Sequence, residues 1–99
     1  MQEWRVIEDG PKDGESNMAI DKAILMSCEA GLSAPTLRLY SWEQPTLTVG
    51  YAQDFSKEIA VNRCRKLGIQ IVRRPTGGRA LLHDHEVTYS LTVPIPHPK

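Results

Sequence analysis

Three arginines and a pair of glycines lie close together in the C-terminal half of this 99-residue sequence: Arg73, Arg74 and Arg79 flank Gly77 and Gly78. Guanidinium groups bind carboxylate and phosphate oxygens through paired N–H groups. Glycines lack a Cβ atom, so a ligand can come close to their backbone N–H groups, and successive N–H groups in such a turn form a concave anion site. These residues therefore indicate a loop that binds an acidic or phosphorylated small molecule.

An ordinary hairpin turn with exposed arginines explains the same residues. Pro75 presets one backbone angle of a turn, and Gly77 and Gly78 permit a positive φ. Glycine-rich hairpin turns are common. The sequence also lacks the Walker spacing and the three-glycine dinucleotide fingerprint. Both interpretations stay open at this level, and the three converging arginines favour ligand binding.

Apolar segments on both sides must position this loop. Residues 69–72 predict a strand that enters it, and residues 80–83 predict a strand that leaves it. After a turn at Asp84 and His85, alternating apolar residues predict a further strand over 86–93. The loop is thus expected to join two strands of a sheet.

The N-terminal half predicts three more strands and two helices. We expect strands at 4–8, 36–42 and 46–51, and a turn at 9–14. One helix should begin at a cap formed by Ser16 or Asn17 and end at Gly31, and a second should span 56–67 and end at Gly68. Gly50 indicates a bulge or the close approach of another group. The fold class is therefore α/β (α+β), with a mixed, largely antiparallel sheet and two helices.

Other chemistry finds little support in the sequence. His83 and His85 flank Asp84, but a zinc site needs three or four ligands and no third one has a recognisable spacing. Cys28 and Cys64 lie on apolar faces of predicted helices, without an evident base, and are expected to be reduced. We therefore assign neither a metal ligand nor a catalytic residue.

The bulk composition narrows the class of protein. Twelve basic and 12 acidic residues cancel, which gives no support for a nucleic-acid-binding surface. No apolar run is as long as a membrane span, and the N-terminus has no signal-peptide pattern, so we expect a cytoplasmic protein. The length permits one domain at most, or part of one.

Several motifs together resemble one known family. Residues 73–84 read Arg-Arg-Pro-Thr-Gly-Gly-Arg-Ala-Leu-Leu-His-Asp and are followed by Glu-Val-Thr-Tyr-Ser at 86–90. This run resembles the ligand loop of the lipoate–protein ligase and octanoyltransferase superfamily, which includes the biotin ligases. Residues 17–21, 37–42 and 48–53 resemble its first helix and next two strands. Family members are more than twice as long, so residues 1–99 are expected to form the N-terminal part of such a catalytic domain.

The resemblance implies a particular chemistry. A medium-chain acyl group, octanoyl or lipoyl, lies beside the glycine loop and is transferred to a lysine of a lipoyl domain or of the glycine-cleavage H protein. The implied substrate-binding residues are Tyr51, Arg73, Arg74, Thr76, Gly77, Gly78, Arg79, Ala80, Leu81, Leu82 and His83. Gln53 is a further candidate neighbour of the pocket. The family's acyl-contacting lysine and transferase cysteine lie downstream of this match, so the chain alone is expected to be inactive.

The family has two branches that differ in how the acyl group is activated. Ligases use ATP and magnesium to form an acyl-adenylate, whose phosphate the loop and the arginine matching Arg74 hold. Octanoyltransferases need no nucleotide and take the acyl group from octanoyl-acyl carrier protein. Arg79 stands where ligases usually have a third glycine, and this favours the transferase branch. The ATP-dependent ligase, a non-catalytic binding module, and a unit that self-associates or pairs with a C-terminal chain remain as alternatives.

Overall fold

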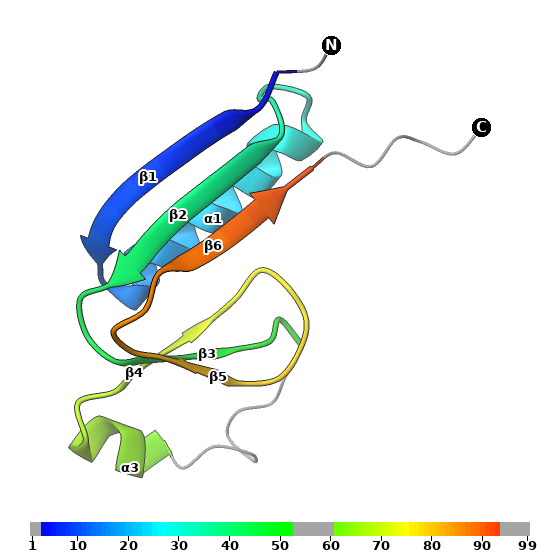
Figure 1. Cartoon of the computed structure of the whole chain (residues 1–99). Coiled ribbons are helices and arrows are strands. Elements are labelled where there is room, and N and C mark those ends of the chain that lie inside the picture. The colour runs from blue at the N-terminus through cyan, green and yellow to red at the C-terminus, as the bar shows by residue number, and fades with distance from the viewer. Residues whose placement is uncertain (1–2, 53–60, 94–99) are drawn as a thin grey trace.

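The computed structural model describes residues 3–52 and 61–93, which form two three-stranded sheets and two helices (Figure 1). In chain order the elements are β1 Arg5–Lys12, α1 Gly14–Glu29, β2 Thr36–Trp42, β3 Thr46–Val49, α3 Val61–Lys66, β4 Gln70–Arg73, β5 Leu81–His83 and β6 Thr88–Thr92. Among the described residues, neither helix is long and apolar enough to cross a membrane. The predicted α/β class with mixed strand directions is confirmed.

The first sheet has the order β1-β2-β6 and is covered on one side by α1 (Figure 1). β1 runs parallel to β2, and β6 runs antiparallel to it. The second sheet has the order β4-β3-β5, and again one neighbour of the central strand is parallel and the other antiparallel. The strands are thus divided between two sheets, in which the described pairings include as many parallel as antiparallel pairs.

The glycine loop, residues 74–80, connects the two outer strands of the second sheet. β4 and β5 both pair with β3, which lies between them. The loop must therefore cross the end of β3, and this brings it over Val49 and Gly50. The sheet thus fixes both ends of the loop, as the flanking apolar segments predict.

The start of the chain differs from the prediction. The turn expected at 9–14 is wrong, because β1 continues to Lys12 with a register shift between Glu8 and Pro11. Proline is tolerated there because β1 is an edge strand. The cap of α1 is Asp13, rather than Ser16 or Asn17: its carboxylate accepts a hydrogen bond from the Ser16 N–H at 2.9 Å.

The predicted ends of both helices are confirmed. Gly31 and Gly68 follow α1 and α3 with φ values of +74° and +73°, in the left-handed region that glycine adopts without strain. Of the helix expected at 56–67, the described part is α3, residues Val61–Lys66. Residues 56–60 of that prediction, and Gln53, lie outside the described residues.

The face of the first sheet that packs on α1 is the polar and aromatic one. Thr36, Arg38, Tyr40 and Trp42 alternate along β2 and are buried, whereas Leu37 and Leu39 on the other face are half-exposed. The core cluster combines Tyr40 and Trp42 with Met18 of α1 and Val72 of β4. Buried polar groups need hydrogen-bond partners, and residues of α1 supply them to this face.

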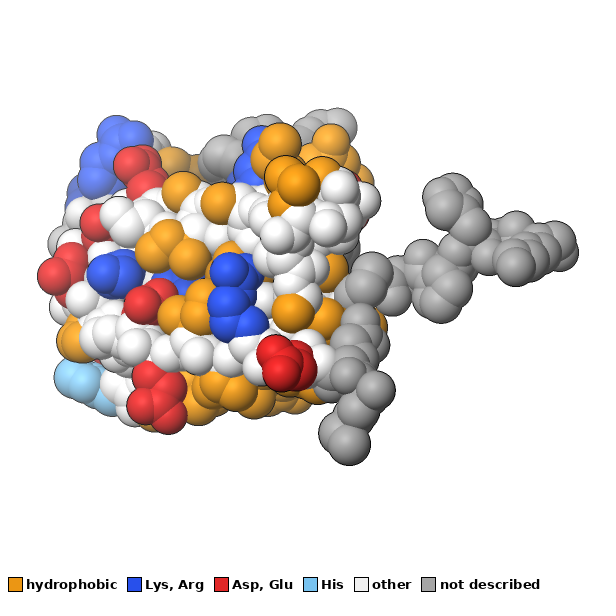
Figure 2. All heavy atoms as spheres, turned by 90° about the horizontal axis from the view of Figure 1, so that it is seen from above, with side chains coloured by type: hydrophobic (Ala, Val, Ile, Leu, Met, Phe, Trp, Pro, Cys, Tyr) orange, Lys and Arg blue, Asp and Glu red, His pale blue; other side chains and the backbone are white. Residues whose placement is uncertain are grey.

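The opposite face of the first sheet is apolar and open. Val6, Leu37 and Leu91 lie side by side across its three strands, and Leu39 and Tyr89 form a neighbouring pair. Val6 is 59% exposed and Tyr89 is 70% exposed. Seen from above, hydrophobic side chains follow the lower margin of the molecule, which is the side facing the viewer in Figure 1 (Figure 2).

Candidate functional site

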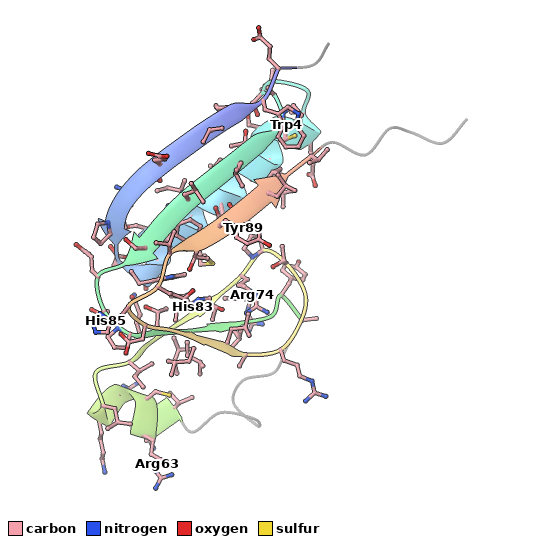
Figure 3. The ribbon with its side chains drawn as sticks, in the orientation of Figure 1. Trp4, Arg63, Arg74, His83, His85 and Tyr89 are labelled. Atoms are coloured by element: carbon pink, nitrogen blue, oxygen red, sulfur yellow. The ribbon has the colours of Figure 1, made fainter. Side chains whose placement is uncertain are left out.

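A cleft of about 600 Å³ opens between α1, the buried face of β2 and β6, and the glycine loop. Its lining combines apolar side chains with hydroxyl groups and charges: Met18, Asp21, Leu25, Tyr40, Trp42, Thr48, residues 74–79, Leu81, His83 and residues 88–93. Figure 3 shows Arg74 and His83 between the two sheets, with Tyr89 above them on β6. A largely apolar lining with a few polar groups is typical of small-molecule sites.

Arg74 organises the glycine loop from inside. Its Nη1 donates to the carbonyl oxygen of Thr48 at 3.1 Å and to the hydroxyl Oγ1 of the same residue at 2.7 Å. Its Nη2 donates to the carbonyl oxygens of Gly77 at 3.0 Å and Arg79 at 2.8 Å. Partial burial lowers the pKa of this guanidinium from its usual value, because desolvation disfavours the charged form. Arg74 thus ties both limbs of the loop to β3.

Backbone contacts close the other side of the loop. The N–H of Tyr51 donates to the carbonyl oxygen of Thr76 at 2.7 Å, and Arg73 donates through Nη1 to the carbonyl oxygens of Gly50 and Tyr51, each at 2.9 Å. Gly50 lies directly against the backbone of Gly78, where a Cβ atom would overlap the carbonyl group. The close approach predicted from Gly50 is therefore confirmed, and the approaching group is the loop.

A buried polar network forms the wall opposite the loop. The Arg38 side chain is fully buried and donates to Asp9 at 2.8 Å and to Asp21 at 3.0 Å. The second carboxylate oxygen of Asp21 accepts from the Tyr40 hydroxyl at 2.8 Å, and Ser90 donates to the first. Burial, and then the negative charge of Asp21, raises the pKa of Tyr40, so this phenol stays protonated. The wall holds α1, β2 and β6 together.

His83 occupies the floor of the cleft. Its ring stacks on Trp42 with the ring centroids 4.5 Å apart, and its Nε2 lies 2.9 Å from the Thr48 hydroxyl. Its Nδ1 lies 3.2 Å from the Glu86 carboxylate. Desolvation raises the pKa of Glu86, but hydrogen bonds from Thr88 and His83 outweigh it, and the net pKa is lowered. His83 is thus held on three sides.

The predicted site residues fall into three groups. Arg74, Thr76, Gly77, Gly78, Arg79, Leu81 and His83 line the cleft. Arg73 and Tyr51 instead line a neighbouring hollow between α1 and β4. Ala80 is half-buried, and Leu82 is exposed and alternates with Leu81 and His83 along β5; neither lines either of these two hollows.

Sequence reasoning missed most of the wall opposite the loop. Asp21, Tyr40, Trp42, Thr48 and Ser90 all line the cleft. For Tyr40, Trp42 and Ser90 the signal is the polar and aromatic half of the strand alternation in residues 36–42 and 86–93. Asp21 lies on α1, and Thr48 lies on β3 beside the loop rather than on the opposite wall. The histidines diverge: the side chain of His85 is 95% exposed and lies away from His83 (Figure 3). Within 3–52 and 61–93, no three His, Cys, Asp or Glu side chains are grouped to hold a metal ion.

The fold and this loop-bounded cleft define a recognisable class of protein. A family model described as the lipoyl protein ligase A/B catalytic domain matches residues 13–99. The chain therefore belongs to the lipoyl protein ligase A/B catalytic domain family.

Curated relatives resemble the chain over its whole length. The octanoyltransferase LipM of Carboxydothermus hydrogenoformans is 48% identical over 99 residues, which cover 100% of this chain and 37% of that protein. The octanoyltransferase LipM of Moorella thermoacetica is 48% identical over 95 residues, which cover 96% of this chain and 35% of that protein. The chain thus spans little more than a third of the length of these relatives.

Solved structures show the same arrangement of elements. A lipoate-protein ligase A bound with ATP superposes with a TM-score of 0.75 and 33% identity, over 90% of this chain and 36% of that one. A bi-partite lipoate protein ligase from Thermoplasma acidophilum, studied with its E2 lipoyl domain, gives a TM-score of 0.76 and 31% identity, over 92% of this chain and 36% of that one. The expected N-terminal part of a ligase-type fold is confirmed.

Proposed function

We propose that this chain is the loop-bearing part of an octanoyltransferase in protein lipoylation. In this function the cleft holds a medium-chain acyl group, which is passed from octanoyl-acyl carrier protein to a lysine of a lipoyl domain or of the glycine-cleavage H protein. The observation that carries the proposal is the 48% identity to octanoyltransferase LipM over the whole chain. The cleft beside the glycine loop supports the proposal, because the family resemblance implies an acyl group beside this loop.

The lining of the cleft supports an acyl ligand. Met18, Leu25, Trp42 and Leu81 offer apolar surface for a hydrocarbon chain. Polar groups gather at the loop, whose residues Gly77 and Gly78 line the cleft. A hydrocarbon of eight carbons, once desolvated, gains about 0.8 kcal/mol for each buried CH₂ group. Chain burial therefore supplies affinity, and the loop supplies orientation.

The loop supports the transferase branch over the ATP-dependent ligase. A guanidinium binds a phosphate through N–H groups that are not already engaged, and the Nη hydrogens of Arg74 point to oxygens of Thr48, Gly77 and Arg79. Arg79 also carries a long side chain where, by the family resemblance, ligases usually have glycine. Both features favour a function that uses neither ATP nor magnesium, and we propose that branch.

The open face of the first sheet supports a second role for this part of the protein. Val6, Leu91 and Tyr89 form an apolar surface that monomeric soluble proteins rarely leave exposed. We propose that this face pairs with a C-terminal chain or with another copy of this one.

An acyl-transfer assay tests the function. The chain is mixed with the C-terminal remainder of the Carboxydothermus relative, octanoyl-acyl carrier protein and a lipoyl domain, and octanoylation is followed by intact mass. We expect a mass gain of one octanoyl group without ATP. A gain that requires octanoate, ATP and magnesium would support the ligase, and a gain from neither mixture would contradict an acyl-transfer role.

A further inference from the structure

We infer that Glu86, His83 and Thr48 are positioning residues that act through Arg74 to set the shape of the glycine loop. The inference rests on the proposed function, in which the loop orients a ligand in the cleft. It assigns Arg74 to the loop itself, rather than to the ligand.

The Nη donor groups of Arg74 link Thr48 to the glycine loop. A guanidinium has four hydrogens on its two Nη atoms. Two of them go to the carbonyl and hydroxyl oxygens of Thr48, and two go to the carbonyl oxygens of Gly77 and Arg79. Both loop carbonyls are thus drawn towards Arg74. Gly78, with φ at +103°, turns the chain between them.

The hydroxyl group of Thr48 fixes the direction of the next bond. Because Oγ1 accepts a hydrogen from Arg74, its own hydrogen is free to be donated to Nε2 of His83, which lies 2.9 Å away. Thr48 is fully buried, so no water competes for that hydrogen. With a neutral ring, this direction makes Nε2 of His83 the bare nitrogen and puts the ring proton on Nδ1.

Glu86 selects that arrangement. Its Oε2 lies 3.2 Å from Nδ1 of His83 and also accepts from Thr88 at 2.7 Å, while Thr88 accepts from Nε1 of Trp42 at 2.8 Å. With the proton on Nε2 instead, the lone pair of Nδ1 would face a carboxylate, and the Thr48 hydroxyl would lose its acceptor. One chain of hydrogen bonds therefore runs from Arg74 to the β5–β6 turn, with a single consistent direction.

NMR spectroscopy tests this chain of hydrogen bonds without an activity assay. Long-range ¹H–¹⁵N spectra report the tautomer of His83, and side-chain spectra report the exchange of the Arg74 Nη hydrogens. In the 99-residue protein we expect the Nδ1–H tautomer and slowly exchanging Nη hydrogens. Glu86→Gln is expected to give a mixture of tautomers, and Thr48→Val to speed Nη exchange while Thr48→Ser preserves it.

Titration with octanoate then separates this inference from the proposed function. Loss of one hydrogen bond to the charged Arg74 should weaken octanoate binding roughly tenfold in Thr48→Val. Thr48→Ser, which keeps the hydroxyl group, should bind octanoate more tightly than Thr48→Val. If the native protein has the Nε2–H tautomer, or if all three variants bind octanoate as the native protein does, the inference is overturned. If the spectra respond as expected but octanoate does not bind the native protein, the proposed function fails and the positioning role stands.

Discussion

Gly50 and Gly78 meet backbone against backbone at the point where the glycine loop crosses the end of β3. A Cβ atom built on Gly50 would overlap the carbonyl oxygen of Gly78 and lie 2.9 Å from its carbonyl carbon. Both groups belong to the main chain, so neither can turn aside as a flexible side chain does. The loop can adopt its observed position only because residue 50 has no side chain.

Gly50→Ala is therefore expected to displace the loop and to destabilise the fold. Overpacking of this kind costs about 1–3 kcal/mol. Thermal unfolding followed by circular dichroism, together with octanoate titration, measures both effects. Gly10→Ala is the matched control, since nothing lies within 4 Å of a Cβ at that position. Equal loss in both variants would show that the contact with Gly78 has no special role.

Arg38→Met should unfold the protein or nearly so. The native guanidinium is fully buried between Asp9 and Asp21, and its removal leaves these two carboxylates without their cation. Breaking a buried ion pair costs about 3–5 kcal/mol, which is comparable to the whole stability of a small domain. Urea unfolding provides the measurement, with Arg63→Met on the exposed surface of α3 as control. If Arg38→Met and Arg63→Met unfold at the same urea concentration, the buried network does not stabilise the fold.

The Asp13 cap makes stability depend on pH. The Ser16 N–H donates to the Asp13 carboxylate and lowers its pKa from the ordinary value of 3.8. A carboxyl group with a lowered folded pKa stabilises the fold above its unfolded pKa, and this contribution is lost as the pH falls through the folded value. Asp13→Ala should thus melt below the native protein at pH 7 and converge with it near pH 2. Melting temperatures across that range test this, with Asp13→Ser as the variant that keeps an uncharged cap.

The open apolar face should make the protein associate. Leu37 lies at the centre of this face, with Val6 on one side and Leu91 on the other, and a lysine at position 6 would place charge on the surface that two molecules share. Sedimentation velocity over a range of concentrations should show association in the native protein and a monomer in Val6→Lys. The control is Leu32→Lys, because Leu32 is 81% exposed beyond the end of α1. If the native protein is a monomer at all concentrations, this face is not a self-association surface.

Local signals predicted the elements well, because they depend on neighbours in the chain. The alternation of residues 36–42 and the glycines at 31 and 68 each fix a local conformation, and all are confirmed. The turn at 9–14 was wrong because Asp9 pairs with Arg38, which is 29 positions away in the sequence. A pattern of turn-forming residues carries no information about such a partner.

Only one of the two walls of the candidate site could be predicted from the sequence. The motif pointed to the glycine loop, but the wall that faces it comes from α1, β2 and β6, and only the packing of the two sheets brings these elements together. Tyr40 and Ser90 show the difficulty, since each looks like an ordinary strand residue and gains its role from Asp21. The hydrogen-bond partners of Arg74 could not be predicted from the sequence either, because an arginine beside glycines can donate equally well to an anion or to a loop carbonyl.

The central claim is that the cleft beneath the glycine loop binds a medium-chain acyl group, and octanoate titration observed by backbone NMR tests it most directly. The account predicts saturable shifts confined to the cleft, at Gly77, Gly78, Leu81 and Ser90, with none at Val6 or Arg63. It also predicts that a bulky residue in place of Met18, such as Met18→Trp, abolishes them. Shifts that spread over the open sheet face instead, or no saturable binding at all, would contradict the account.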